Sequence, residues 1–261
     1  MNAGRVLILL CMLVVAGCAT QPPQSEVRPE RDTSGGEADA RMRARLHTEL
    51  AAGYYELGNM NIALEETNIA LRADPGYSPA YNIAGLIYAV LKEDQLAEQN
   101  FQQATRINPS DSDANHNYGW FLCQRNRVPE ALKAFQAAVR NPLYQTPDRT
   151  YVNAGLCARQ SGDLATAEQY FQNALRTRPS QPQALYQLAD LAYARGDFGS
   201  AKQYLNRLTK VAQPGAEVLW LGVRIERRLG DRNSEESYAH RLRNSFPDSK
   251  ETQALLAGQN E

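Results

Sequence analysis

The chain has 261 residues, of which 43% are hydrophobic and 22% are charged. This length and composition predict one or two ordinary globular domains and exclude collagen, wholesale disorder and a polytopic membrane protein. Its 28 Lys and Arg residues nearly balance its 29 Asp and Glu residues, which leaves a formal net charge of -1. Because nucleic-acid affinity depends on many basic side chains meeting phosphates, we expect no nucleic-acid partner.

The first seventeen residues have the pattern of an export signal. Arg5 supplies a positive charge, an unbroken apolar run covers residues 6–16, and Gly17 precedes Cys18. The run is too short to cross a bilayer, because a helix needs about twenty residues for that. We therefore predict a signal peptide over residues 1–17.

The four residues from Val15 to Cys18 resemble the bacterial lipoprotein box. In such lipoproteins the cysteine sulfur takes a diacylglycerol, which makes Cys18 the predicted lipidation site and the first residue of the mature chain. Each buried methylene contributes about 0.8 kcal/mol, so three acyl chains form a durable anchor. Ala19 stands where inner-membrane lipoproteins carry aspartate, so the resemblance implies a lipid anchor at the periplasmic face of the outer membrane. The alternative is an ordinary secretory signal with an incidental cysteine.

Residues 18–40 combine this anchor with a predicted disordered tether. The segment contains several prolines, glycines and charged residues, with almost no large apolar side chain to bury. Such a composition cannot offset the conformational entropy lost on folding. The folded domain is therefore predicted to cover residues 41–261.

Within residues 41–261 the sequence repeats with a period of about thirty-four residues, and this period decides the fold. A mostly small residue recurs at spacings of 34, 34, 36, 34 and 34, at Ala63, Ala97, Ala131, Ala167, Ala201 and Glu235. Four residues later stands a column rich in phenylalanine, at Thr67, Phe101, Phe135, Phe171, Leu205 and Ala239. A second small column precedes the first by twelve residues, at Ala51, Gly85, Gly119, Gly155, Ala189 and Val223. Antiparallel helices approach closely where small side chains face one another, so each unit is predicted to be a helix pair, with Gly85 facing Ala97.

The connection inside each pair has its own pattern. Mostly residues that tolerate a left-handed backbone stand at the end of the first helix, at Gly58, Lys92, Asn126, Gly162, Gly196 and Gly230. The next position offers a side-chain oxygen that can cap the second helix, at Asn59, Asp163, Asp197 and Asp231.

These columns resemble the tetratricopeptide repeat. The resemblance implies an all-α fold in which six helix pairs stack into a right-handed superhelical solenoid. We place the units at about 44–77, 78–111, 112–147, 148–181, 182–215 and 216–249. Leu255 and Leu256 are expected to supply a short capping helix, because the last repeat has no following neighbour.

The sequence lacks the usual motifs of nucleotide, zinc and serine-hydrolase sites. No phosphate-binding glycine loop, HExxH, GxSxG or paired CxxC occurs, so we expect no enzymatic activity, no cofactor and no small-molecule substrate. Residues 111–115 imitate the start of a calcium loop, but His116 and Leu122 stand where glycine and glutamate belong. We interpret this segment as a helix-capping turn. An enzyme hidden in the helical scaffold is the alternative.

Cys123 and Cys157 lie on the first helices of adjacent units. They occupy repeat positions twelve and ten, so on similar helices their directions differ by about 200°. A disulfide forms only if one cysteine faces forward and the other faces back. We expect two separate thiols that pack as small apolar residues.

In tetratricopeptide proteins the partner lies against positions two, five, nine, twelve and thirteen of each first helix. For this sequence the resemblance therefore implies a groove that is apolar and aromatic, with a basic end. Its candidate partner-binding residues are Tyr55, Asn82, Leu86, His116, Trp120, Tyr186, Tyr193, Trp220 and Arg224. For Trp120, Tyr186 and Trp220 the alternative, that they fill gaps between stacked helices, is equally open.

The lipoprotein box, the short tether and the six repeats together resemble the pilotin lipoproteins of type IV pili, of the PilF/PilW kind. The resemblance is carried by residues 117–122, 142–144, 153–156 and 188–191. It implies an outer-membrane lipoprotein that binds the secretin of the type IV pilus, localises its subunits to the outer membrane and promotes their multimerisation. The alternative is a periplasmic adaptor for peptidoglycan hydrolases or for outer-membrane assembly.

Overall fold

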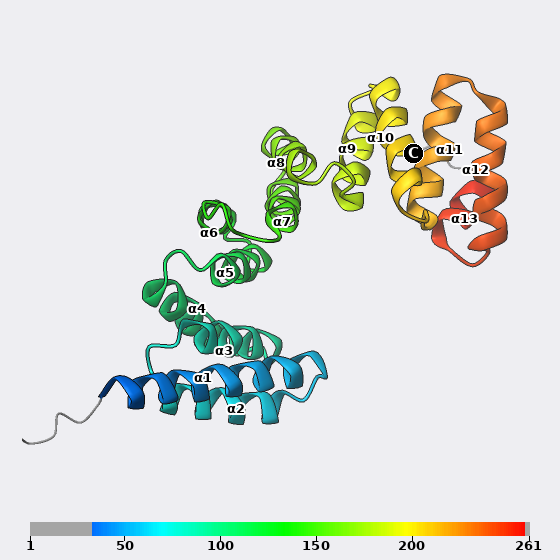
Figure 1. The fold of residues 1–261 in the computed structure, drawn as a ribbon. Coiled ribbons are helices and arrows are strands. Elements are labelled where there is room, and N and C mark those ends of the chain that lie inside the picture. Colours follow the sequence, from blue (N-terminus) through cyan, green and yellow to red (C-terminus); the bar gives the residue numbers. More distant parts are fainter. Residues whose placement is uncertain (1–32, 259–261) are drawn as a thin grey trace, which may run out of the picture.

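The computed structural model describes residues 33–258, and all regular structure within that range is helical (Figure 1). The helices are α1 (Thr33–Glu56), α2 (Met60–Ala73), α3 (Ser78–Val90), α4 (Asp94–Ile107), α5 (Ser112–Gln124), α6 (Val128–Ala138), α7 (Pro147–Gln160), α8 (Leu164–Thr177), α9 (Pro182–Ala194), α10 (Phe198–Val211), α11 (Ala216–Leu229), α12 (Arg232–Ser245) and α13 (Lys250–Leu256). The prediction of an all-α fold is confirmed. The predicted signal peptide and Cys18 lie outside the described residues.

The first twelve helices form six pairs, in which each odd-numbered helix packs against the even-numbered helix that follows it. Each pair then contacts the next pair along the chain. Figure 1 shows the pairs following one another along a curved row, with α1 and α2 at one end and α11, α12 and α13 at the other. The prediction of a solenoid built from six helix pairs is confirmed.

The connections inside the pairs have the backbone conformation that the sequence predicts. The φ angles are 77° at Gly58, 66° at Lys92, 61° at Asn126, 83° at Gly162 and Gly196, and 76° at Gly230. These values lie in the left-handed region, which glycine adopts without strain and which asparagine tolerates better than most residues. Local backbone chemistry therefore explains where the first helix ends in five of the six pairs, whereas Lys92 adopts this conformation without the residue type that favours it.

Three of the four predicted caps on the second helices are present. Asp163, Asp197 and Asp231 each accept a hydrogen bond from the backbone N–H three residues later, at 3.0, 3.0 and 3.1 Å. Asn59 makes no side-chain cap bond, so the prediction is wrong there. Asp111 caps α5 in the same manner, accepting from the N–H of Ala114 at 3.0 Å, which confirms the interpretation of residues 111–115 as a capping turn.

The glycines of the second small column make room for phenylalanine rings of the second helix. A Cβ atom added to Gly85 would lie 2.7 Å from the ring of Phe101, well inside van der Waals contact. The same relationship joins Gly119 to Phe135 at 2.8 Å and Gly155 to Phe171 at 2.6 Å. Because these rings are completely or almost completely buried, each glycine allows one aromatic ring to fill the core of its pair.

The sixth repeat makes this contact one residue earlier. A Cβ atom on Gly222 would lie 2.8 Å from the ring of Tyr238. The predicted columns of this unit, Val223 and Ala239, are buried as well. The register of the repeat is therefore kept, while the aromatic contact moves to the neighbouring positions.

The helical region begins earlier than the sequence suggested. Helix α1 starts at Thr33, so the prediction of a disordered tether is wrong for residues 33–40. The physical reason is that residues 37–43 are alanine, methionine, glutamate, arginine and one aspartate, mostly good helix formers, and they extend α1 without a proline. Within residues 33–258, no helix is both long enough and apolar enough to cross a membrane.

Helix α13 buries two polar residues, while Leu255 is half-buried and Leu256 is exposed. Glu251 and Thr252 are buried, whereas Leu256 is 71% exposed. The hydroxyl of Thr252 donates to the carbonyl oxygen of Phe246 at 2.7 Å, which joins α13 to the end of α12. The expectation of a short terminal helix is met, but the role given to Leu256 is wrong.

Cys123 and Cys157 are joined by a disulfide between α5 and α7, with their Cα atoms 5.7 Å apart. The expectation of two separate thiols is therefore wrong. Both cysteines are buried at the boundary between the third and fourth repeats. The difference of about 200° in direction is what brings them together, because α5 directs Cys123 toward the following repeat and α7 directs Cys157 back toward it.

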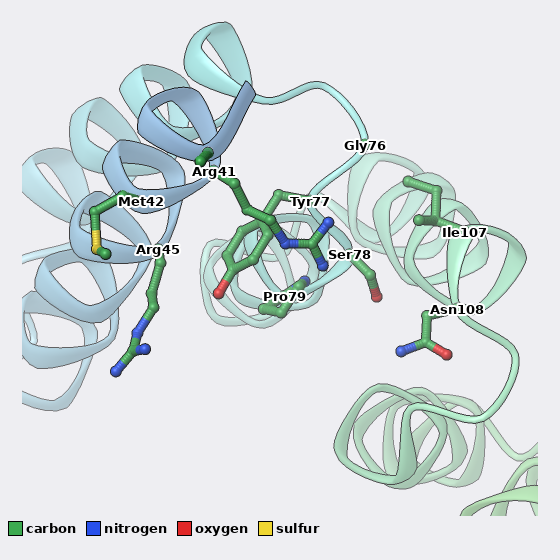
Figure 2. Close-up of a pocket in the computed structure, with 10 residues that line it drawn as sticks. Arg41, Met42, Arg45, Gly76, Tyr77, Ser78, Pro79, Ile107 and Asn108 are labelled. Carbon is green, nitrogen blue, oxygen red and sulfur yellow. The ribbon is translucent and has the colours of Figure 1, made fainter. Parts of the chain in front are cut away.

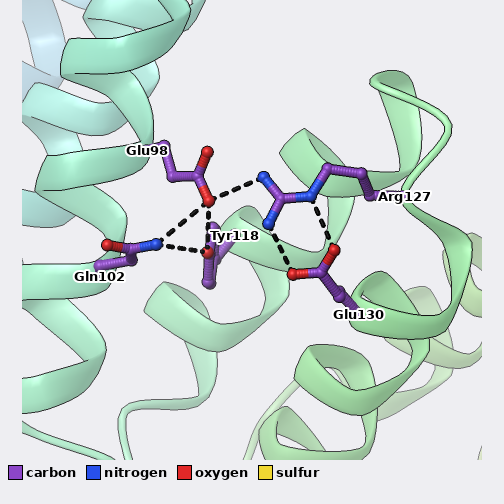
Figure 3. Close-up of polar contacts among 5 residues, drawn as sticks. All are labelled: Glu98, Gln102, Tyr118, Arg127 and Glu130. Atoms are coloured by element: carbon purple, nitrogen blue, oxygen red, sulfur yellow. Dashed lines mark hydrogen bonds and ion pairs between the residues drawn. The ribbon is translucent and has the colours of Figure 1, made fainter.

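A polar network joins the second and third repeats on another face of the solenoid (Figure 3). Arg127 donates to Glu98 of α4 at 2.7 Å and to Glu130 of α6 at 2.5 Å. The hydroxyl of Tyr118, on α5, donates to Glu98 at 3.1 Å and accepts from Gln102 at 3.2 Å. These bonds fix three successive helices relative to one another.

Candidate partner-binding groove

The nine candidate residues lie on first helices of five of the six repeats, but the structure gives them different environments. Trp120 is 37% exposed, and Tyr55 and Leu86 are half-buried. These three side chains come from α1, α3 and α5, and all three present apolar surface to solvent. We call the face formed by positions two, five, nine, twelve and thirteen of the first helices the groove face.

Asn82 belongs to the packing between repeats. Its side chain is only 7% exposed, and its oxygen accepts a hydrogen bond from Asn117 of the next repeat at 3.1 Å. A buried amide of this kind is costly to leave without its partner. The expectation that Asn82 lines an open groove is therefore wrong, and its side chain supports the register of α3 against α5.

His116 also makes contacts between repeats. Its Nδ1 atom lies 2.7 Å from the hydroxyl oxygen of Thr150, and its Nε2 atom lies 3.3 Å from the side-chain nitrogen of Asn153. Its ring meets the ring of Phe135 edge-on, with centroids 5.9 Å apart. Burial, with the nearby positive charge of Arg149, lowers the pKa of His116 to about 4. His116 is thus a neutral link between α5 and α7, not an exposed groove residue.

The other four candidates lie on α9 and α11 of the fifth and sixth repeats, close to the carboxylate of Asp190. Arg159 of α7 donates to Asp190 of α9 at 2.5 Å, and Arg224 of α11 lies 3.8 Å from the other oxygen of Asp190. Arg159 also donates to Gln187. One carboxylate therefore positions guanidinium groups from two different repeats.

Aromatic rings pack against Arg224, one of the two arginines that share the carboxylate of Asp190. The guanidinium carbon of Arg224 lies 4.8 Å from the ring centre of Tyr193 and 5.9 Å from that of Trp220. Such contacts between a cation and an aromatic face are attractive. Burial and the charge of Asp190 raise the pKa of Tyr186 above its usual range, so its hydroxyl stays protonated and can donate a hydrogen bond. We call the six residues the arginine–aromatic cluster: Arg159, Tyr186, Asp190, Tyr193, Trp220 and Arg224.

A hollow lies beside this cluster, between α7 and α9. Its volume is about 440 Å³, and its lining includes Leu156 and Gln160 of α7 together with Arg159, Tyr186 and Asp190. Gln187, which the sequence did not single out, completes the lining and holds Arg159. Gln187 occupies repeat position six, just outside the positions that the family pattern marks, so the sequence carried no signal for it.

A second hollow lies at the other end of the solenoid, where α1 extends past the start of α3 (Figure 2). It has a volume of about 730 Å³ and is lined by Arg41, Met42 and Arg45 of α1 together with Tyr77 and Pro79. The guanidinium carbon of Arg41 lies 5.8 Å from the ring centre of Tyr77. The sequence prediction missed this hollow because the repeat pattern places the first unit at about residue 44 and therefore does not show that Arg41 and Met42 lie on a helix beside Tyr77.

Charge is distributed unevenly along the groove face. In the first three repeats its charged residues are Arg45, Glu56 and Asp113. In the last three they are Arg149, Arg159, Arg224, Arg227, Arg228, Asp190 and Glu217. The groove face is therefore slightly acidic in its first half and strongly basic in its second half, although the chain as a whole is nearly neutral.

Within residues 33–258, no group of three or more His, Cys, Asp or Glu side chains is arranged to hold a metal ion. The polar groups of the arginine–aromatic cluster bind and orient one another, and they offer donors and aromatic faces at the surface. This arrangement suits recognition of another molecule.

Family models of the tetratricopeptide repeat match residues 48–112 and 122–182, residues 100–133 and residues 158–220. The type IV pilus assembly protein PilF of Pseudomonas aeruginosa is 28% identical over 193 residues, which are 74% of each chain. A solved structure of Pseudomonas aeruginosa PilF has a TM-score of 0.75 and 28% identity, with 86% of this chain and 100% of that chain covered. The crystal structure of PilW, described as a widely conserved type IV pilus biogenesis factor, has a TM-score of 0.70 and 33% identity, with 82% and 98% covered. The chain therefore belongs to the tetratricopeptide repeat family and is homologous to PilF and PilW.

Proposed function

We propose that this protein is an outer-membrane pilotin lipoprotein of type IV pilus biogenesis, which binds secretin subunits and promotes their localisation and multimerisation. The observation that carries the proposal is the similarity to PilW, a pilus biogenesis factor, at 33% identity over 98% of that chain. This similarity covers 82% of this chain and therefore extends over most of the solenoid.

The predicted anchor supports the same role. A lipid on Cys18 would confine the protein to the membrane in which its partner assembles. Anchoring two molecules to one surface raises their effective concentration without any new contact. The protein needs no catalytic group for this role, because holding subunits near one another is enough to favour their association.

Exposed Trp120 is the side chain of the groove face best suited to hold a partner. Tryptophan is enriched among residues that dominate binding energy at interfaces, and Trp120 remains 37% exposed while the phenylalanines of the repeats are buried. Leu86 and Tyr55 of the two preceding repeats continue the apolar surface.

The test is the amount of heat-resistant secretin multimer in a strain that lacks this protein. We expect the multimer to be lost, restored by the wild-type gene, and restored poorly by Cys18→Ser, which should also move the protein out of the outer-membrane fraction. Trp120→Ala should restore it less well than Lys133→Ala, an exposed control on α6. Normal multimer levels in the deletion strain would contradict the proposal. A pull-down that recovers peptidoglycan hydrolases or outer-membrane assembly subunits without secretin would favour an adaptor role.

A further inference from the structure

The second half of the groove face carries features that a general docking surface does not require. Two guanidinium groups from different repeats, those of Arg159 and Arg224, converge on Asp190. Two further arginines follow on α11, of which Arg227 pairs with Glu235 at 2.7 Å and Arg228 lies over the ring of Phe198. The side chain of Arg224 lies against two aromatic rings, so the charge is presented next to apolar surface.

The arginine side chains are held in place before any partner arrives. Arg159 donates to both Asp190 and Gln187, and Gln187 is itself 7% exposed. A guanidinium whose rotamer is already fixed loses less entropy on binding than a mobile one. Arginine also presents paired donors that match the two oxygens of a carboxylate.

We propose that the arginine–aromatic cluster binds an acidic segment of the partner protein, with partner carboxylates on Arg159 and Arg224 and partner apolar side chains against Tyr186, Tyr193 and Trp220. This proposal rests on the proposed function, because the acidic segment would belong to the secretin. Charge complementarity selects this occupant, because five arginines and two carboxylates occupy the groove positions of these repeats.

The geometry also suggests how the segment is placed. Leu156 lines the hollow on the α7 side, and the cluster continues across α9 to α11. A segment that crosses these three helices meets Arg159 beside Leu156 and Tyr186 in the hollow between α7 and α9, and then Arg224 beside Tyr193 and Trp220. Acidic residues that alternate with apolar residues would match this order.

The first experiment uses random twelve-residue peptides displayed on phage, selected against the purified full-length protein in detergent. We expect enrichment of peptides with two or more Asp or Glu residues. The strongest peptide is then synthesised and its binding measured by fluorescence anisotropy at 50 and 500 mM NaCl. The affinity should fall at least tenfold at the higher salt concentration, because salt screens exposed charges.

Matched variants separate this site from general positive charge. Arg159→Gln with Arg224→Gln should weaken peptide binding at least tenfold. Arg140→Gln with Arg176→Gln, which removes the same charge from exposed positions outside the groove face, should leave it within twofold. Replacement of Arg159 and Arg224 by lysine keeps the charge but not the paired donors, and we expect an intermediate loss. Circular dichroism melting curves identify any variant that fails to fold. If Arg159→Gln with Arg224→Gln fails to fold, Arg159→Lys with Arg224→Lys takes its place in the binding measurement.

The outcomes distinguish this proposal from the proposed function. Failure to enrich acidic peptides, or equal binding by the wild type and Arg159→Gln with Arg224→Gln, overturns the acidic-segment proposal. If Arg159→Gln with Arg224→Gln still recovers secretin from detergent-solubilised membranes, the pilotin role stands and the secretin contacts another part of the molecule. If the wild type enriches acidic peptides but recovers no secretin, the pilotin role fails while the acidic-segment site remains.

Discussion

Cys123 and Cys157 are bonded across the boundary between the third and fourth repeats, with their Cα atoms 5.7 Å apart. In a repeat protein each unit contacts only its neighbours, so stability depends on the interfaces between units. A covalent bond at one interface prevents the two halves of the solenoid from separating there.

We predict that loss of this bond destabilises the domain. Closing a loop over the sequence separation of 34 residues contributes about 3 to 4 kcal/mol in the chain-entropy model. Urea unfolding with and without dithiothreitol measures the effect. The variant Cys123→Ser with Cys157→Ser should show the reduced protein's midpoint and should not respond to dithiothreitol. An unchanged midpoint of the wild type after complete reduction, checked by thiol titration, would contradict the prediction.

The second prediction concerns the close approach of Gly85 to Phe101. A methyl group at residue 85 would overlap the Phe101 ring, so Gly85→Ala should lower the free energy of unfolding by about 1 to 3 kcal/mol. Gly53→Ala is the matched control, because nothing lies within 4 Å of an added Cβ there. That variant should gain about 0.5 to 1 kcal/mol from helix propensity. Combining Gly85→Ala with Phe101→Leu should recover part of the loss, and a purely additive result would argue against direct contact.

The third prediction is a pH dependence that comes from His116. Its pKa is lowered to about 4 in the folded protein, against about 6.5 in an unfolded chain. The unfolded state therefore binds a proton first as the pH falls. The contribution of His116 to stability is complete above about pH 6.5 and is lost as the pH falls toward 4, with a change of at most about 3 kcal/mol.

Unfolding midpoints at pH 7.0 and pH 4.5 test this prediction. His116→Gln should be less stable than the wild type at pH 7.0, because its contacts with Thr150 and Asn153 are altered, but should lose less stability on acidification. Carboxylates titrate equally in both proteins, so the difference between the two pH responses isolates His116. Identical responses would show that His116 does not titrate in this range.

The fourth prediction concerns Glu226, which is 2% exposed. Its carboxylate accepts a hydrogen bond from Lys202 at 2.7 Å, which joins α10 to α11. Lys202 is 33% exposed and also contacts Asp231, so solvent screens part of the interaction, and Lys202→Met should cost about 1 to 3 kcal/mol by leaving the Glu226 carboxylate without its cation. The double variant Lys202→Met with Glu226→Leu should regain most of that loss. Hydrogen exchange should locate the loosened amides in the fifth and sixth repeats, and uniform loosening of all six repeats would contradict the local interpretation.

Much of the fold could be predicted because each repeat is specified by local chemistry. The left-handed residues at Gly58, Gly162 and Gly196 and the caps at Asp163 and Asp197 act over three or four residues of chain, so their role is visible in the sequence. The recurring small and aromatic columns then repeat this information six times. The start of α1 was missed because the prediction relied on the repeated small and apolar residues, whereas residues 37–43 favour a helix without belonging to a repeat.

The candidate site was harder to predict because the family positions describe a single helix and not the fit between neighbouring helices. Tyr186, Tyr193, Trp220 and Arg224 were found by their positions, and the structure brings them together around Asp190. Asn82 has the same type of position, yet the neighbouring repeat covers it. The position of a residue within its repeat does not predict how much of its side chain the helices of the next repeat will bury.

Periodicity, turn chemistry and composition were enough to predict a row of six helix pairs with a basic and aromatic second half, because all three are properties of the chain. The folded molecule was needed to show that Cys123 meets Cys157, that His116 is a link between repeats, and that Arg159 and Arg224 share one carboxylate. These outcomes depend on the rotation and offset between one repeat and the next. A period of thirty-four residues does not encode that geometry, which arises when side chains from neighbouring helices pack together.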